Sequence, residues 1–211
     1  MLITTAKERP IIFSGPMVRA ILDGKKTQTR RIVKPQPTQR MIEVDFTLNK
    51  SSRKWSDLQS LWTCPYGRAG DRLWVRETYC QKAEDGYPVF NREGNLDQSC
   101  YHYRADGYHV VKADGDGGIE FTKDGREASP WKPSIFMPRH ASRITLEVTA
   151  VRVERLQEIT EADAQLEGFA QTNTTLARSE FIRLWKVING AASWDANPWA
   201  WVVSFKRVNQ E

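Results

Sequence analysis

The chain is poor in cysteine and histidine, with three of each among 211 residues. The odd number and wide spacing of Cys64, Cys80 and Cys100 indicate reduced thiols rather than a disulfide framework. The Cys and His residues match no common spacing of zinc ligands, so we expect neither a metal nor another cofactor. No stretch approaches the roughly 18 apolar residues needed to span a membrane, and residues 1–10 lack the apolar core of a signal peptide. We therefore expect a cytoplasmic protein with no membrane partner.

The composition fits a folded, slightly basic protein. The apolar fraction of 40% is enough for a core, and the formal net charge is +5. A moderate excess of cations favours an anionic partner without requiring one. The length suits one domain with insertions better than two small domains, so we expect a single domain over residues 1–211.

The most informative stretch is the basic run Gly24-Lys25-Lys26-Thr27-Gln28-Thr29-Arg30-Arg31. A helix is predicted before it at about 16–23, with Pro16 at the first helical position and Gly24 as the stop. The run therefore lies on a turn that leads into a strand, where cations and hydroxyls suit an anionic or nucleotide-like ligand. A solvated or phosphate-steering surface is the alternative. Since Lys26 and Thr29 belong to no apolar stripe, we expect their substitution to leave the fold intact.

Further elements are predicted along the second half of the chain. Alternation from Ile144 to Val153 predicts a long amphipathic strand, and its phase slip at Thr149-Ala150 predicts a bulge or bend. Thr160 is the expected N-cap of a short helix that ends before Gly168. A second helix is expected at about 175–188. The almost continuous apolar run from Trp199 predicts a strand that is buried on both faces.

The basic run resembles the signature of the ASCH family, Gly-x-Lys-x-x-(Glu or Thr)-x-Arg, which follows the first helix of a small PUA-like β-barrel. Gly24, Lys26, Thr29 and Arg31 fill its four positions. The resemblance continues in the expected order through residues 70–77, 144–148, 156–168 and 199–207. It implies an α+β fold: a PUA-like, mixed, mostly antiparallel β-barrel with flanking helices. The longer ASCH proteins often encoded by phages and prophages are the most similar in layout.

Two long insertions into this barrel are expected, at about 35–66 and 80–131. Both are rich in turn residues, and long irregular segments in a compact domain are usually functional lids or mobile surface. They are also the parts of the chain best suited to contact a protein partner.

The resemblance also implies a chemistry. Small ASCH proteins include amidohydrolases that remove the acetyl group from N4-acetylcytidine, and other members are ribonucleases. By that resemblance Lys26 is the general base, Thr29 the nucleophile and Glu167 the acid that protonates the leaving amine. A lysine acts as a base only when burial or nearby cations such as Arg30 lower its pKa. On a regular strand Lys26 and Thr29 would face opposite sides, so this hypothesis requires a turn or bulge between them.

The expected partners are RNA, another single-stranded nucleic acid or a modified nucleoside. The residues expected to bind them, besides the three above, are Lys25, Arg30, Arg31, Trp131, Arg139, His140 and Arg143. Three hypotheses stay open: binding with hydrolysis of the bound group, a binding module without catalysis, and a phage accessory protein that contacts a protein through its insertions. Lys26, Thr29 and Glu167 gathered around one cavity would favour hydrolysis.

Overall fold

The computed structural model describes residues 6–37, 63–81, 89–90, 101–107, 109–110, 131–171 and 175–208. The expected insertions at about 35–66 and 80–131 lie largely outside these ranges, so their roles stay predictions. The chain divides into two compact units. The first unit comprises Met1–Arg9, Ala20–Leu73 and Leu146–Glu211, and the second comprises Pro10–Arg19 and Trp74–Thr145. A single domain over the whole chain stays a prediction.

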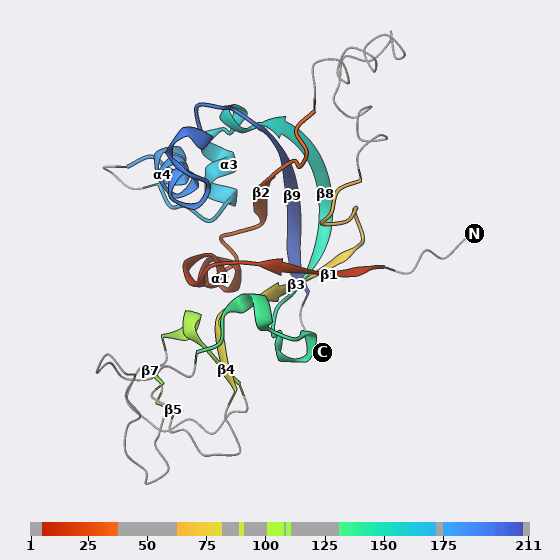
Figure 1. The fold of residues 1–211 in the computed structure, drawn as a ribbon, viewed down its shortest axis with the longest axis vertical. Coiled ribbons are helices and arrows are strands. Elements are labelled where there is room, and N and C mark those ends of the chain that lie inside the picture. The colour runs from red at the N-terminus through yellow and green to blue at the C-terminus, as the bar shows by residue number, and fades with distance from the viewer. Residues whose placement is uncertain are drawn as a thin grey trace, which may run out of the picture. The chain divides into compact units, whose positions relative to one another are not determined.

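Strands and a few helices make up the regular structure of the described residues (Figure 1). The strands are β1 (Glu8–Ile12), β2 (Gln28–Ile32), β3 (Arg72–Arg76), β4 (Tyr79–Gln81), β5 (Val89–Phe90), β6 (Tyr101–Tyr103), β7 (His109–Val110), β8 (Thr145–Arg155) and β9 (Trp199–Val208). The α-helices are α1 (Gly15–Leu22), α3 (Glu161–Leu166) and α4 (Ala177–Asn189). Single turns of 3-10 helix include η3 (Ser134–Phe136) and η4 (Arg139–Ala141). In the ranges described, no helix is both long and apolar enough to cross a membrane.

The strands pair in the order β1-β3-β8-β9-β2, and the pairs β4-β6 and β5-β7 form two smaller sheets. The pairs β2-β9, β4-β6 and β5-β7 are antiparallel. The predicted α+β class, with a mostly antiparallel sheet and few helices, is confirmed. Closure of the strands into a barrel stays a prediction.

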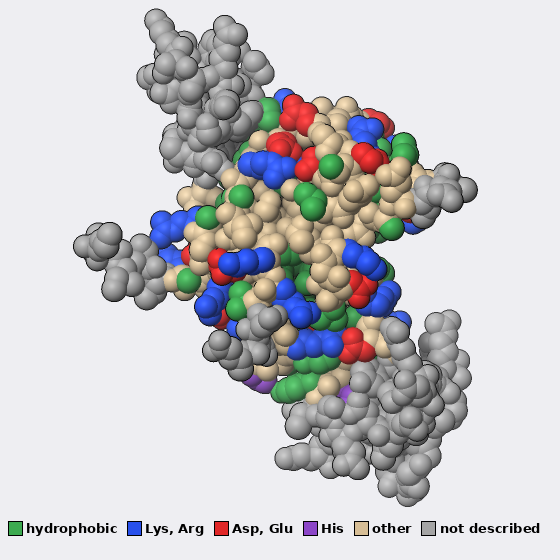
Figure 2. Space-filling view, turned by 180° about the vertical axis from the view of Figure 1, so that it is seen from behind, with side chains coloured by type: hydrophobic (Ala, Val, Ile, Leu, Met, Phe, Trp, Pro, Cys, Tyr) green, Lys and Arg blue, Asp and Glu red, His purple; other side chains and the backbone are tan. Residues whose placement is uncertain are grey.

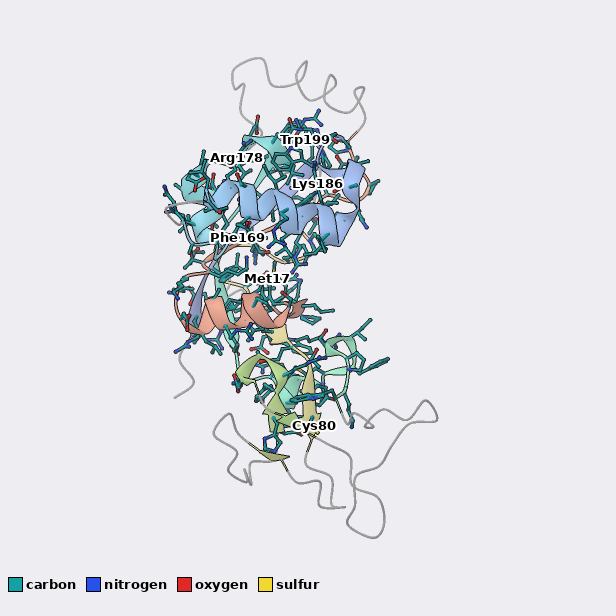
Figure 3. All side chains as sticks on the ribbon, turned by 90° about the vertical axis from the view of Figure 1, so that its left-hand side faces the viewer. Met17, Cys80, Phe169, Arg178, Lys186 and Trp199 are labelled. Carbon is teal, nitrogen blue, oxygen red and sulfur yellow. The ribbon has the colours of Figure 1, made fainter. Side chains whose placement is uncertain are left out.

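In the first unit, α3 and α4 pack on each other, and α3 also packs on β2. Their apolar faces form a core with the turn after β8, made of Leu156, Ile159, Ala164, Ala177, Phe181 and Trp185. Phe169, which follows α3 and is labelled in Figure 3, meets Phe181 edge to face with ring centroids 5.9 Å apart. Burial of this apolar face, more than intrinsic propensity, stabilises helices as short as these.

In the second unit, the segment from residue 131 to residue 143 packs on β4 and β6. Met137 and Ala141 form a small core with Tyr79, and Tyr101 and Tyr103 pack against it. The Tyr103 hydroxyl donates a hydrogen bond of 2.8 Å to the carbonyl oxygen of Ala141. The tyrosines therefore hold a segment with little regular structure in a defined position.

Candidate functional site

The basic run places three polar side chains on one face of β2. Gly24 has a φ of +72°, in the left-handed region that favours glycine, and it follows the end of α1. Lys26 then forms an isolated bridge with Glu167, and β2 begins at Gln28. Because side chains alternate along an extended chain, Lys26, Gln28 and Arg30 point to the same side.

Lys26 and Glu167 form a buried ion pair. The Lys26 Nζ lies 2.8 Å from Glu167 Oε2, and the two side chains are 0% and 3% exposed. The same nitrogen donates bonds of 2.8 Å to the backbone carbonyl oxygens of Gln28 and Glu167. An ammonium group has three donors, so these bonds use its full capacity. In this arrangement Lys26 has no donor left for a ligand.

The pKa of Lys26 is lowered from its ordinary value of 10.5. Burial is the largest cause, because it penalises the charged form. The negative charge of Glu167 acts in the opposite direction, and Arg31 and Arg30 lower the pKa further by repulsion. The sequence suggested that burial and neighbouring arginines would lower the pKa of Lys26, and both causes act in the structure.

Gly168 lets the end of α3 approach Lys26 closely. Its φ is +96°, and a Cβ atom there would lie 3.0 Å from the Cβ of Ala20 and 3.1 Å from that of Lys26. Any larger residue would therefore push Glu167 and Lys26 apart. Glycine at position 168 is therefore needed for packing.

Arg30 lies beside this pair and is surrounded by carboxylates. Its side chain is 0% exposed, with an Nη2 atom 3.0 Å from Glu154 Oε2 and 3.4 Å from Asp163 Oδ2. Its Nη1 atom lies 3.4 Å from Glu167 Oε1. Arg152 binds Asp163 Oδ1 at 3.1 Å and also pairs with Glu154. A fixed guanidinium fork suits such multiple pairing.

The contacts of Arg30 with Glu154 and of Arg152 with Gln28 reach from β2 to β8 across β9, which lies between these two strands. The β9 residues opposite Gln28, Arg30 and Ile32 are the small Ser204, Val202 and Ala200. The long side chains can therefore cross β9 without a clash. We call the resulting group the ionic cluster; its members are Lys26, Gln28, Arg30, Arg152, Glu154, Asp163 and Glu167. Its three cations and three carboxylates balance, and each carboxylate already binds a cation of the protein.

Asp163 joins the ionic cluster to the start of α3. It forms a capping box with Thr160, whose hydroxyl and backbone N–H both bond to it. Burial alone would raise the pKa of Asp163, but the bonds from Thr160, the charge of Arg30 and the bond from Gln28 outweigh it and lower the pKa to about 2. The carboxylate is therefore charged at neutral pH.

The other predicted residues of the basic run lie elsewhere. Thr29 and Arg31 alternate with Arg30 on β2, so they face the side opposite the ionic cluster. Thr29 is buried, at 3% exposure. Lys25 has a side chain that is 67% exposed and pairs with Asp23 at 3.0 Å. The structure thus brings together Lys26, Arg30 and Glu167, and it places Thr29 on the other face of the strand.

Among the predicted residues of the second unit, Arg143 is the most fully engaged. Its guanidinium pairs with Glu77 at 2.9 Å and with Asp106 at 2.6 Å. It also lies over the ring of Tyr103, with its central carbon 4.0 Å from the ring centroid. Four of its five N–H donors bind these carboxylates, so a phosphate could bind in a bidentate way only by displacing one of them. Arg143 therefore serves to fix the local structure.

The remaining three predicted residues lie on one short segment. Trp131 is half-buried, Arg139 donates a bond of 3.3 Å to Thr145 Oγ1, and His140 is exposed with its ring 6.1 Å from that of Tyr101. All three belong to the second unit, whereas the ionic cluster belongs to the first.

The sequence pattern does not indicate that two apolar side chains of this segment are exposed. Ile135 and Phe136 are 59% and 70% exposed, whereas Met137 beside them is fully buried. Three apolar residues in a row carry no periodicity, so the pattern does not say which of them faces the core. The one available signal was the position of the run between Pro133 and Pro138, which favours turns over a strand.

No group of three or more His, Cys, Asp or Glu side chains in the described residues is placed to hold a metal ion. The acidic members of the ionic cluster are held by lysine and arginine. The cluster can therefore fix the geometry of β2, β8 and α3, and it can move protons only after one of its bonds opens.

Comparisons with known proteins gave no matching family model and no matching curated protein. Two solved structures are similar over almost the whole chain. A protein of Enterococcus faecalis V583 assigned to DUF984 matches with a TM-score of 0.39 and 10% identity, over 97% of this chain and 82% of its own. An ASCH domain from Lactobacillus crispatus JV V101 matches with a TM-score of 0.36 and 12% identity, over 95% of this chain and 79% of its own. The name of the second structure is that of the family that the basic run resembles. Both similarities are distant, so neither indicates a ligand or an activity for this chain.

Proposed function

We propose that the protein binds single-stranded RNA through residues 131–140 of its second unit. The observation that supports this most is Phe136, an aromatic ring that is 70% exposed on a well-defined turn. Large aromatic side chains are usually buried when they have no partner to meet. An exposed ring beside cations is typical of proteins that stack unpaired bases.

The turn fixes the position of this ring. The N–H of Phe136 donates to Pro133 O at 3.0 Å, and the N–H of Met137 donates to Ser134 O at 3.1 Å. Met137 is buried directly beside it and anchors the turn. The Tyr79 hydroxyl adds a bond of 3.3 Å to the carbonyl oxygen of Phe136. A ring held in this way loses little conformational entropy when a base stacks on it.

Basic residues flank Phe136 in the sequence of the same segment. Lys132 is exposed, and its backbone is paired with Tyr79 on β4 by bonds of 2.8 and 3.3 Å. Arg139 and His140 follow on η4. These groups suit the phosphates that lie on either side of a stacked base. On the face seen in Figure 2, basic and acidic side chains are mixed, so affinity depends on such local groups.

Fluorescence anisotropy with labelled single-stranded RNAs of several sequences tests this proposal. We expect Phe136→Ala to weaken binding about 5- to 150-fold, since stacking of one base contributes about 1–3 kcal/mol. Phe136→Tyr should bind as the wild type does. The matched control is Val187→Ala on α4, which shortens another apolar side chain of 73% exposure. Equal affinities for Phe136→Ala and Val187→Ala would contradict the proposal.

Hydrolysis of a bound group, such as the amide of an N4-acylated cytidine or an RNA phosphodiester, is the second candidate function. It is favoured by the 2.8 Å contact of Lys26 with Glu167 and by the lowered pKa of that lysine. Transfer of one proton from the Lys26 ammonium to the Glu167 carboxylate would let Lys26 act as base toward the Thr29 nucleophile and Glu167 as acid toward the leaving group, and water would then release the group from Thr29. The reaction would require Lys26 to release one bond and β2 to turn Thr29 toward it.

Mass spectrometry of products tests this candidate after incubation with N4-acetylcytidine, a panel of other nucleosides and single-stranded RNAs. Thr29→Val removes the hydroxyl and preserves the shape of the side chain, so it should abolish turnover without disturbing the ionic cluster. Thr29→Ser should retain turnover. Glu167→Gln should slow the reaction by about two to four orders of magnitude. If the wild type converts no member of the panel, hydrolysis is rejected and RNA binding is unaffected.

A further inference from the structure

A pocket of about 740 Å³ opens on the first unit, and no residue of the ionic cluster lines it. One wall is the turn that carries Gly67, Arg68 and Asp71, and another is formed by Thr149 and Ala150 of β8. Thr149 and Ala150 are both exposed, which interrupts the alternation of burial along the strand. The phase slip in the sequence therefore coincides with the part of β8 that lines the pocket.

Asp71 organises the basic side of this pocket. Its carboxylate accepts bonds of 3.0 Å from the N–H of Lys7, 2.9 Å from Arg9 Nη1 and 3.2 Å from the N–H of Arg68. These bonds lower the pKa of Asp71 although burial works against them. A single charged carboxylate thus holds three separate backbone or side-chain groups, each from a cationic residue.

Gly67 shows how tightly this arrangement is built. Its φ is +98°, and a Cβ atom there would lie 2.7 Å from Asp71 Oδ2 and 2.8 Å from Arg9 Nη1. Both distances are far below van der Waals contact. Only glycine fits beside the ion pair of Arg9 and Asp71, so the pair has a defined position at the pocket wall.

The pocket carries an excess of positive charge. Lys7, Arg9 and Arg68 line it together with one carboxylate, Asp71. Lys7 and Arg68 are exposed, and no acidic side chain of the described residues pairs with either. Arg9 uses one nitrogen for Asp71, which leaves further donors of its guanidinium fork for an anion. A net excess of two cations matches the charge of a phosphomonoester near neutral pH.

The floor of the pocket is less polar. The buried side chains of Cys64 and Trp201 contribute to it. Burial raises the pKa of the Cys64 thiol, so this residue stays neutral at pH 7 and adds no negative charge. The volume lies within the range of pockets that hold drug-sized ligands, far larger than a lone phosphate requires.

We propose that this pocket binds an organic phosphomonoester of nucleotide size, with the phosphate against Lys7, Arg9 and Arg68 and the organic body over Cys64 and Trp201. The phosphate can come from a free nucleotide or from the 5′ end of an RNA. The pocket shares no residue with the segment 131–140, so this inference and the proposed RNA surface can fail separately.

Isothermal titration calorimetry of the full chain tests the pocket with the four ribonucleoside 5′-monophosphates and the four matching nucleosides. We expect at least one monophosphate to bind about tenfold or more tightly than its nucleoside. Arg68→Ala should weaken that binding by about tenfold or more, and Arg68→Lys should restore part of it. The control is Arg183→Ala on α4, which removes a cation that is 70% exposed and pairs with Glu180.

A second arm compares RNAs that carry a 5′-phosphate or a 5′-hydroxyl, in the Phe136→Ala background. A preference for the 5′-phosphate that Arg68→Ala removes would support the pocket with RNA ends as its source. The inference is overturned if neither monophosphates nor 5′-phosphorylated RNA bind better than their phosphate-free forms. It is also overturned if Arg68→Ala and Arg183→Ala weaken binding equally.

Discussion

Lys26 and Glu167 form an ion pair of 2.8 Å from which water is almost entirely excluded, with side chains 0% and 3% exposed. The pair joins the start of β2 to the end of α3 across 141 residues of sequence. Two charges removed from water in this way must stay together, because either one alone would be strongly destabilising.

Lys26→Met should therefore lower the free energy of unfolding by about 3–5 kcal/mol, the loss typical when one partner of a buried ion pair is removed. Urea denaturation followed by circular dichroism measures this loss. The sequence alone predicts an intact fold for substitutions of Lys26, since this residue belongs to no apolar stripe. A loss below about 1 kcal/mol would show that the pair is less buried than described.

The double variant Lys26→Met, Glu167→Leu should be less destabilised than the sum of the two single variants. Replacement of a whole buried pair by apolar residues is often neutral, whereas each single change leaves a charge behind. Arg30 keeps Glu154 and Asp163 as partners in the double variant. Additive effects in this double-mutant cycle would contradict a direct coupling.

Asp163 should make stability depend on pH below 4. Its pKa is lowered from 3.8 to about 2 in the folded protein, so the folded state binds fewer protons than the unfolded state between these values. Its contribution, about 2 kcal/mol, is complete above pH 4 and is lost as the pH falls toward 2. Asp163→Asn should flatten this part of the profile of stability against pH. An unchanged acid profile in that variant would be inconsistent with the described contacts.

Arg143→Ala should destabilise the second unit by about 3–5 kcal/mol, because Glu77 stays behind with 1% exposure. Burial raises the pKa of Glu77, and loss of the arginine would raise it further. The folded state of the variant would then bind more protons than the unfolded state above the ordinary pKa of 4.5, so its stability should fall as the pH rises from there.

Arg143→Lys should not restore stability, since lysine cannot pair with both carboxylates in the same geometry. Thermal unfolding from pH 5 to 8 checks this.

The elements with strong local signals were predicted well. Gly24 marks the end of α1 and Thr160 is the N-cap of α3. The phase slip at Thr149-Ala150 coincides with two exposed residues within β8, and a bulge or bend there stays a prediction. The helix expected at about 175–188 is α4, Ala177–Asn189. Each of these signals depends on a few neighbouring residues, which is why the sequence alone reveals them.

The members of the site that depend on strand order could not be predicted. Glu154 pairs with Arg30, and Arg152 with Gln28, across β9, which lies between β8 and β2 and carries small side chains there. Phe136 is exposed and Met137 buried because of how the turn packs on β4 and β6. Neither relationship leaves a period or a motif in the sequence.

Affinity for single-stranded RNA should fall as the salt concentration rises, because cationic side chains of the segment 131–140 neutralise phosphates and so release counterions bound to the RNA. Arg139→Ala should reduce the magnitude of the slope of log K against log salt concentration by about 0.7, the value for one phosphate contact with a single strand. The control Arg183→Ala should leave the slope unchanged. A slope near zero in the wild type would point to a ligand held by base contacts alone.

Ultraviolet cross-linking of the full-length protein to single-stranded RNA, followed by mass spectrometry of the cross-linked peptides, tests the central claim most directly. We expect the main cross-linked peptide to be the one that contains Phe136, and we expect Phe136→Ala to remove that cross-link. Cross-links confined to peptides of the first unit, or an undiminished cross-link in Phe136→Ala, would contradict the assignment of this segment as the RNA-binding surface.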